Sequence, residues 1–251
     1  MNSFKLYCIT ILFFFGQIIY GQTDSTKSVS SFSGSIGITN NGFSIIPTFS
    51  LNSPAAIMNF TWQKKRFSFN PDIRLVADGS KGGFLFWLRY QAIQQKKFGL
   101  RLSAHPAFSF IRRVVNDPNG STEITEMLRF LAYEIAPSYQ ITPHLNVSAT
   151  YLQGNALQTH GPQLTQVLFL HTNLTNLPLG GDFQLQVSPS YYFLSTDGYT
   201  GNYLAATVGL SKKEYPLSLQ YTINHTFNST IPGNQSFMWN IMLSYRFNKK
   251  I

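Results

Sequence analysis

Residues 237–247 alternate between apolar and polar side chains with a period of two. One face carries Phe237, Trp239, Ile241, Leu243, Tyr245 and Phe247, and the other carries Met238, Asn240, Met242, Ser244 and Arg246. Residues 183–193 and 217–227 repeat this alternation, and no stretch holds a 3.6-residue period over three turns. A period of two is typical of a strand with one apolar face, so the sequence predicts an all-β fold.

The same pattern predicts about twelve antiparallel strands. They lie near residues 43–51, 55–63, 66–76, 83–93, 97–113, 124–140, 144–153, 163–176, 181–194, 202–211, 215–227 and 236–247. The segment 124–140 is the least regular, because Leu128 and Phe130 are out of phase with Leu131 and Tyr133. We therefore expect a β-bulge in this strand.

The connections alternate in length along the chain. Those after even-numbered strands are short, whereas those after odd-numbered strands from the third onward are longer and rich in turn residues. Four lysine doublets follow the second, fourth, tenth and twelfth strands, namely Lys64–Lys65, Lys96–Lys97, Lys212–Lys213 and Lys249–Lys250. Short turns on one side and longer loops on the other are typical of a transmembrane barrel, with the short turns and the lysines on its periplasmic side.

The strands carry very few charges for a water-soluble sheet. Charged residues make up 12% of the chain, against roughly 25% in soluble domains, and aromatic residues make up 15%. A soluble two-sheet sandwich would also bury one apolar face, but its outer surface would be rich in Lys and Glu. Hydrocarbon outside and polar groups inside account for both faces. The predicted fold is therefore a transmembrane antiparallel up-and-down β-barrel of about twelve strands.

The first residues have the composition of a targeting segment. Lys5 precedes an almost entirely apolar run over 6–20, and Gly21 offers a small residue for cleavage, so residues 1–21 are predicted to be a signal peptide. An anchoring helix is the alternative. The only cysteine, Cys8, lies in this segment, which excludes disulfides and thiol chemistry from the mature chain.

Residues 22–42 are predicted to be an N-terminal segment, either periplasmic or partly inserted as a strand, ahead of a barrel over 43–251. Residues 31–39 read as a strand followed by a tight turn at Asn40-Asn41-Gly42. Counting that strand would give thirteen, whereas bacterial single-chain barrels have even numbers of strands. A barrel of fourteen strands is the next possibility.

The final strand ends in the sequence MLSYRF, in which Tyr245 and Phe247 alternate. In this feature the chain resembles outer-membrane β-barrel proteins of Gram-negative bacteria, including small porin-like barrels, over about residues 43–247. The resemblance implies that Tyr245 and Phe247 are the signal read by the barrel-assembly machinery. The family often ends on the aromatic residue, whereas here NKKI follows. The Asn-rich and Ile-rich strands are also similar to barrels of Bacteroidota.

Function is expected on the polar, lumenal face of the strands. The candidate lumen-lining residues are Arg66, Asp72, Arg74, Arg89, Arg101, His105, Glu126, Glu134 and Arg246. Arginine offers a planar, permanently charged fork that binds carboxylates and phosphates. In one interpretation the arginines pair with Asp72, Glu126 and Glu134 and fill the lumen. In the other they form a track that attracts small anionic solutes through an open channel.

The leading hypothesis is a porin-like passive channel, and the alternative is a closed structural or interaction barrel that acts through its outer loops. A lipid-modifying enzyme is less favoured. His225 lies on the lipid face without a serine in phase, and His105 shares its face with Ser109 on the lumenal side. The expected partners are outer-membrane lipid, the assembly machinery and small anionic solutes. No residue spacing predicts a metal site, another cofactor or a nucleic-acid partner.

Overall fold

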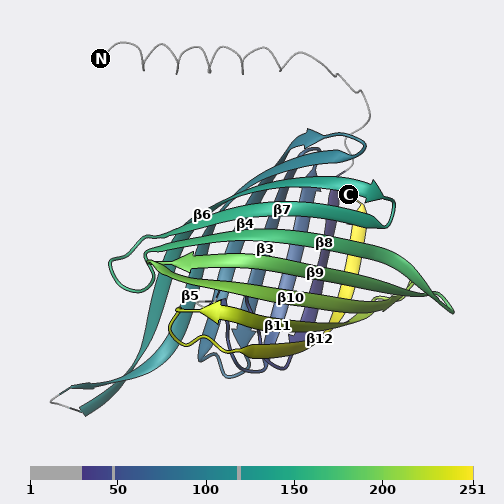
Figure 1. Ribbon diagram of the computed structural model, residues 1–251. Coiled ribbons are helices and arrows are strands. Elements are labelled where there is room, and N and C mark those ends of the chain that lie inside the picture. Colours follow the sequence, from purple (N-terminus) through teal and green to yellow (C-terminus); the bar gives the residue numbers. More distant parts are fainter. Residues whose placement is uncertain (1–29, 47–48, 118–119, 251) are drawn as a thin grey trace, which may run out of the picture.

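The structure, a computed structural model, describes residues 30–46, 49–117 and 120–250. Within this part of the chain, twelve strands form one closed antiparallel barrel in which every strand lies beside its neighbours in sequence and β1 pairs with β12. The strands are β1 (Ser31–Thr39), β2 (Ala55–Lys64), β3 (Phe67–Val76), β4 (Lys81–Gln94), β5 (Phe98–Asp117), β6 (Gly120–Thr142), β7 (Leu145–Ala156), β8 (Leu164–Gly180), β9 (Phe183–Thr196), β10 (Tyr199–Lys212), β11 (Leu217–Ser229) and β12 (Phe237–Lys250). The predicted fold class is confirmed (Figure 1).

The first strand of the barrel differs from the prediction. Residues 31–39 form β1, which pairs with both β2 and β12, so the sheet begins before residue 43. The strand expected over 43–51 is wrong, because no strand lies among residues 43–46 and 49–51. This segment belongs to the β1–β2 connection, and its apolar side chains pack inside the barrel. Apolar residues therefore recur here because they face a core, not because they alternate along a sheet.

The predicted N-terminal boundaries lie partly outside the described residues. The signal peptide over 1–21 is among the residues that the structure does not describe, and it stays a prediction. Of the segment 22–42, residues 31–39 are inserted along the whole length of β1. The strand count stays at twelve, because one strand is gained at residue 31 and the one expected at residue 43 is lost.

The bulge expected around Leu128 is also wrong. The pairing of β6 with β5 continues without a register shift from Gly120 to Tyr139. Phe130 is buried on the lumenal face, whereas Tyr133 is exposed on the outer face. The apparent change of phase arises because apolar residues of β6 lie on both faces. A register shift in β6 occurs instead on its β7 side, between Gln140 and Thr142.

The outer surface of the barrel is apolar along its whole circumference. Exposed outward side chains include Ile36, Ile38, Trp62, Leu88, Leu102, Tyr133, Leu168, Leu170, Tyr191, Leu204, Leu219, Trp239 and Tyr245. The alternating positions point inward and are largely polar or small, such as Thr39, Asn240 and Ser244, which are all buried. An outer surface of this kind is stable only against hydrocarbon, and closure leaves no unpaired strand edge in it.

The two ends of the barrel differ. The short connections 65–66, 95–97, 143–144, 181–182 and 213–216 lie at the end where β12 finishes, and the other connections lie at the opposite end. We call these the periplasmic and outer ends, because short turns mark the periplasmic side of such barrels. At the outer end β5 and β6 continue as a two-stranded ribbon past the rim (Figure 1), beyond the last partners of these strands at Ile111 and Phe130.

No helix in the described part of the chain is long and apolar enough to cross a membrane.

Candidate functional site in the barrel lumen

The outer half of the lumen is filled by apolar side chains. One cluster joins inward residues of β7 to β10, including Val167 and Leu194, which are both 0% exposed. A second cluster joins Phe49 of the β1–β2 connection to Leu85, Ala107 and Phe130 on β4, β5 and β6. A twelve-strand wall encloses a wider space than the eight-strand barrels that side chains alone can fill. Here, segments between the strands supply the remaining apolar volume.

Among these connecting segments, the β1–β2 connection (residues 40–54) supplies most of the apolar side chains. Ile45 and Ile46 pack against the first cluster, Phe49 lies in the second with its ring centroid 5.7 Å from that of Phe130, and Leu51 is buried. Ile231, from the β11–β12 connection, joins the first cluster. The outer half of the lumen is therefore closed by a loop.

Backbone and side-chain hydrogen bonds fix the shape of this loop. The Leu51 amide donates to the Gly42 carbonyl at 3.1 Å, and Gly42 has a positive φ of 56°. The Ser44 amide donates to Ser50 Oγ at 3.0 Å, and that hydroxyl donates to the Ser44 carbonyl at 2.8 Å. Lys81 Nζ donates to the Leu51 carbonyl at 3.4 Å, which joins the loop to β4. These hydrogen bonds satisfy polar groups of a segment that packs against an apolar core, where an unpaired group would be costly.

Beneath the loop lies a polar cavity of about 740 Å³. Residues 43–46 contribute to its lining, together with side chains of β3 to β8 and Thr222 of β11. Its charged lining residues are Asp72, Arg74, Arg89, Arg101 and Glu134. Asn146, Ser148, Thr150 and Asn173 line it from β7 and β8 without charge. Five of the nine predicted lumen residues are thus brought into one cavity.

Two of the three arginines in this cavity have acidic partners. Arg74 forms a bidentate ion pair with Asp72, in which its Nε donates to Oδ1 at 2.9 Å and its Nη2 donates to Oδ2 at 2.7 Å. Arg101 Nε donates to Glu134 Oε1 at 3.0 Å, and the Ser103 hydroxyl donates to the same oxygen at 2.9 Å. These contacts are charge-assisted and hold the side chains against the barrel wall.

Arg89 has no acidic partner in this cavity. Its guanidinium carbon lies 4.7 Å from the centroid of the Trp87 ring, and its Nε is buried without a hydrogen-bond acceptor. His105 packs against Trp87 with 3.8 Å between ring centroids, and its Nδ1 is likewise buried without a partner. A guanidinium stacked on an aromatic face keeps its charge and its remaining donors available. Arg89 is therefore the cation in excess among the charged groups lining the cavity.

The other predicted lumen residues lie elsewhere. Arg66 is exposed at the β2–β3 turn, where its Nη1 donates to the Ala92 carbonyl at 3.4 Å, and Arg246 is exposed near the end of β12. His105 lies on the lumenal wall with 3% of its surface exposed, behind Trp87. Arg66 and Arg246 thus lie toward the periplasmic end and do not line the polar cavity.

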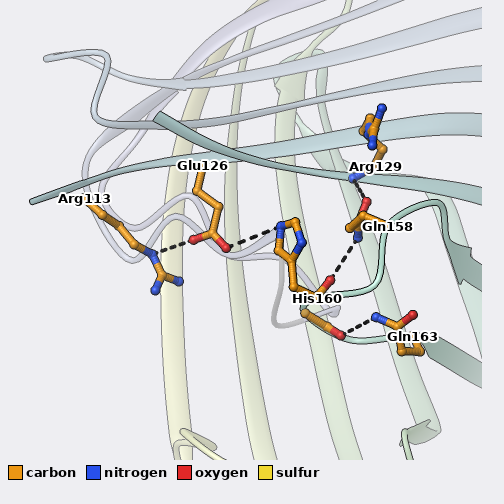
Figure 2. Close-up of polar contacts among 7 residues, drawn as sticks. Arg113, Glu126, Arg129, Gln158, His160 and Gln163 are labelled. Carbon is orange, nitrogen blue, oxygen red and sulfur yellow. Dashed lines mark hydrogen bonds and ion pairs between the residues drawn. The ribbon is translucent and has the colours of Figure 1, made fainter. Parts of the chain in front are cut away.

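Glu126 lies on the ribbon that extends past the rim. Its Oε2 is 2.7 Å from Arg113 Nε and its Oε1 is 3.7 Å from His160 Nε2 (Figure 2). Figure 2 also shows Gln158, which accepts from the Arg129 amide at 2.8 Å and ties the β7–β8 connection to β6. The grouping of Glu126 with the cavity arginines is corrected, because β6 runs past its last pairing with β7 before reaching this residue.

The cavity continues toward the periplasmic end. A second hollow of about 310 Å³ shares Gln91, Ser138 and Asn146 with it. The lining of this hollow also includes Lys65, Lys96 and Lys97, together with several glutamines. A polar path with a basic mouth thus leads inward from the periplasmic end, whereas the outer end is closed by apolar side chains.

Sequence reasoning missed two features of the lumen. His171 Nδ1 lies 2.7 Å from Ser190 Oγ on the cavity wall, although its sequence neighbours offered no serine. Strand pairing brings the two together, since His171 lies opposite Ser190 in the β8–β9 register. The packing of the β1–β2 connection inside the barrel was missed because residues 43–51 were interpreted as a strand. Apolar residues at inward positions of the wall, such as Leu128 and Phe130, could have indicated that an apolar segment packs inside the lumen.

His225 faces outward, edge-on to Phe227 at 5.3 Å between ring centroids. No group of three or more His, Cys, Asp or Glu side chains among the described residues could hold a metal ion.

Tyr245 and Phe247, the aromatic residues of the expected assembly signal, both point outward, and the Phe247 ring centroid lies 5.6 Å from that of Phe32. Their recognition by an assembly machinery stays a prediction.

Comparison with known proteins gives likeness in fold without close relatives. No family model matches the chain, and no curated protein matches it. Among solved structures, the KdgM porin is 12% identical, with 86% of this chain and 99% of that chain covered and a TM-score of 0.49. The NanC porin is 10% identical, with coverages of 86% and 100% and a TM-score of 0.47. OmpT, an outer membrane protein of Vibrio cholerae, is 8% identical, with coverages of 91% and 100% and a TM-score of 0.40.

The closed wall and the large apolar side chains exposed around its exterior decide the location of the protein. It is a multi-pass outer-membrane β-barrel. A soluble protein would not leave so many large apolar side chains exposed around a closed sheet. With identities of 8 to 12% and TM-scores below 0.5 for these three structures, the function has to be argued from the chain's own residues.

Proposed function

We propose that this barrel is a porin-like passive channel for small anionic solutes, held closed at its outer end by residues 40–54. The observation that carries the proposal is the polar path from the basic periplasmic mouth to the cavity beneath the loop. In the wider lumen of twelve strands, connecting segments add to the obstruction by wall side chains, through Ile46, Phe49 and Ile231. A loop can leave the lumen without the wall being rebuilt.

The anion preference rests on the charges that line the path. Arg74 and Arg101 are neutralised by Asp72 and Glu134, which leaves Arg89 as the charge facing the cavity. Lys65, Lys96 and Lys97 at the mouth raise the local concentration of anions. Of the two sequence interpretations, pairing therefore applies to two arginines, and an unpaired charge remains at the third.

Planar-bilayer recordings test this function. We expect the wild-type barrel to conduct rarely, and a variant with residues 43–51 replaced by a Gly-Ser segment of equal length to conduct steadily and prefer anions. In that background, Arg89→Gln should shift the reversal potential toward zero. Arg113→Gln on the outer ribbon is the matched control and should leave it unchanged. Absence of current in both the wild type and the loop variant would overturn the channel.

The alternative is a closed barrel that acts as a structural or interaction protein. The observation that favours it is the dry core of the outer lumen, in which Val167, Leu194 and Tyr192 are at most 1% exposed. If wall side chains close the outer half without the loop, the loop variant will fold and stay silent. The same recording therefore separates the two functions.

A further inference from the structure

The periplasmic end of β2 to β5 is strongly basic. The two turns there, residues 63–67 and 94–98, contain Lys64, Lys65, Arg66, Lys96 and Lys97 and no acidic residue. The turns on the other side of the barrel differ, since the β6–β7 turn carries His144 and the β8–β9 turn carries Asp182. Lys212–Lys213 and Lys249–Lys250 add positive charge elsewhere on this rim, with Glu214 beside the first doublet. The arc over β2 to β5 is the one that carries five cations and no acid in two neighbouring turns, where the barrel meets the periplasmic leaflet of the membrane.

Below this basic arc, the lipid-facing surface of β2 to β5 is hollowed. A groove of about 480 Å³ is lined by Trp62, Phe69, Leu88, Tyr90 and Ala104, and Lys64 and Arg89 also contribute to its lining. The guanidinium of Arg89 stacks on Trp87, which leaves Lys64 as the ammonium group beside the groove. Ala104 is small and leaves room between larger side chains. At the periplasmic end the Tyr90 ring packs against Phe67 in a tilted arrangement, with 4.7 Å between the ring centroids. The groove is apolar with a cation in its lining.

A second hollow of about 510 Å³ lies beside the first. It is lined by Phe32, Phe60, Trp62, Phe69 and Pro71, so Trp62 and Phe69 form a ridge shared by both hollows. Trp62 is 56% exposed, and its indole can contact lipid on either side. Two neighbouring apolar hollows with one adjacent ammonium group match the shape and charge of a lipid with two acyl chains and an anionic headgroup.

We propose that this surface is a binding site for an anionic glycerophospholipid of the periplasmic leaflet. The ammonium of Lys64 binds the headgroup phosphate, and the two acyl chains lie in the hollows on either side of the ridge formed by Trp62 and Phe69. Lys65, Lys96 and Lys97 face the periplasmic mouth of the lumen and add to the local positive potential. A headgroup with a net negative charge is favoured over a zwitterionic one, because the arc contains no acid to bind a choline or ethanolamine.

A second apolar groove, which begins beside the basic arc, offers a matched control surface. It has a volume of about 650 Å³, extends over β5 to β10 and is lined by Phe98, Tyr139, Val147, Leu170 and Leu204 among others, and no lysine or arginine lines it. Tyr139 lies near the periplasmic end of β6, as Trp62 lies near that of β2. Both grooves can receive acyl chains, but only the one near Lys64 has a cation for the headgroup.

Tryptophan quenching by brominated lipid tests the site in the intact barrel. The reporter variant is Trp239→Phe, which leaves Trp62 as the lipid-facing indole and Trp87 as a lumenal background. It is placed in phosphatidylcholine vesicles that contain either dibrominated phosphatidylglycerol or dibrominated phosphatidylcholine at equal mole fraction. We expect brominated phosphatidylglycerol to quench Trp62 with a relative binding constant roughly fivefold higher, the contribution of about one lysine at a membrane surface.

Three further variants decide between specific binding and general attraction. Lys64→Gln should remove the preference, and Lys212→Gln, whose lysine lies 5.8 Å from the Phe183 ring on another part of the rim, should keep it. A reporter with Trp62→Phe, Trp239→Phe and Tyr139→Trp should show equal quenching by the two lipids. Equal quenching at Trp62, a preference that survives Lys64→Gln, or an equal preference at position 139 would each overturn the proposal. None of these outcomes depends on whether the lumen conducts.

Discussion

The two halves of the lumen share strands and side-chain alternation but differ in what they contain. On β8, Val167 lies in the outer half and is fully buried among apolar neighbours, whereas Asn173, on the same face, lines the polar cavity. On β6, Phe130 packs against the loop, and Ser138 lines the path to the periplasmic mouth. The wall is continuous, so the difference arises from the inward side chains of each half and from the loop that packs on the apolar ones.

This difference indicates that one barrel can combine two kinds of interior. The outer half resembles the core of a soluble protein, which is close-packed and depends on complementary shapes. The periplasmic half resembles a binding cleft, with a few polar groups fixed by pairing around solvent-sized space. Stability is therefore expected to come mainly from the outer half, and selectivity from the periplasmic half.

The strongest test of this comparison places the same charge in the outer and in the periplasmic half of the lumen. Val167→Asp buries an unpaired carboxylate in an apolar core, which we expect to cost about 4 to 6 kcal/mol or to prevent assembly. Asn173→Asp introduces the same group beside water and arginines, and should cost less than about 1 kcal/mol. Heat-modifiable gel migration and urea unfolding in lipid vesicles measure both. Similar tolerance at the two positions would show that the outer half is hydrated.

Cavity formation gives the next largest effect. Phe130→Ala removes a ring that packs at 5.7 Å from Phe49, and we expect a loss of about 3 kcal/mol in the free energy of unfolding. Ser138→Ala on the same face of the same strand should change it by less than about 0.5 kcal/mol. If the loop repacks into the space left by Phe130, the loss will be much smaller, and the loop will not be a fitted plug.

The sequence predicted the barrel wall well because alternation is a local property. Most strands of β2 to β12 show their lipid face directly, with β6 as the exception because its apolar residues lie on both faces. The periplasmic position of the four lysine doublets agrees with the observed connections. The first strand was misplaced for a physical reason. Residues 31–39 were interpreted as a strand but left out of the count, because residues 43–51 had already been counted as one and the two together would give thirteen. Residues 43–51 are rich in apolar side chains because they pack in a core.

For the candidate site, the sequence predicted the orientation of single residues better than the contacts between them. The lumenal orientation of Asp72, Arg74, Arg89, Arg101 and Glu134 follows from parity along a strand. The same alternation places Asp72 on one face with Arg74, two residues away, whereas the pairing of Arg101 with Glu134 depends on the register of β5 with β6. The proximity of His171 to Ser190, 2.7 Å between their polar atoms, is likewise a consequence of the β8–β9 register.

The ion pairs test the periplasmic half at a smaller scale. Glu134 is buried and accepts hydrogen bonds from Arg101 and Ser103, so Glu134→Gln should cost about 1.5 kcal/mol, a value reduced by the partial exposure of Arg101. Glu123→Gln breaks a pair of similar length, 2.9 Å to Arg112, on the exposed ribbon. It should cost less than about 0.5 kcal/mol. Equal costs would indicate that the cavity screens charge as well as bulk water does.

The smallest effect concerns a polar pair within the apolar half. The Tyr192 hydroxyl donates to Asn224 Oδ1 at 2.8 Å, both residues are 1% exposed, and Asn224 Nδ2 has no partner. Tyr192→Phe keeps the ring on Tyr203 but leaves the amide unsatisfied, so we expect a loss of about 1 kcal/mol.

Adding Asn224→Leu to that variant separates the core from the cavity. The double variant removes both polar partners, and an apolar core should then recover part or all of the stability lost on Tyr192→Phe. Urea unfolding of the wild type, the two single variants and the double variant gives the coupling energy directly. If Asn224→Leu instead deepens the loss, then water reaches Asn224, and the outer half is a continuation of the polar path. Recovery would place the boundary between the two interiors on the cavity side of Asn224, which fixes the depth that a solute can reach while the loop stays in place.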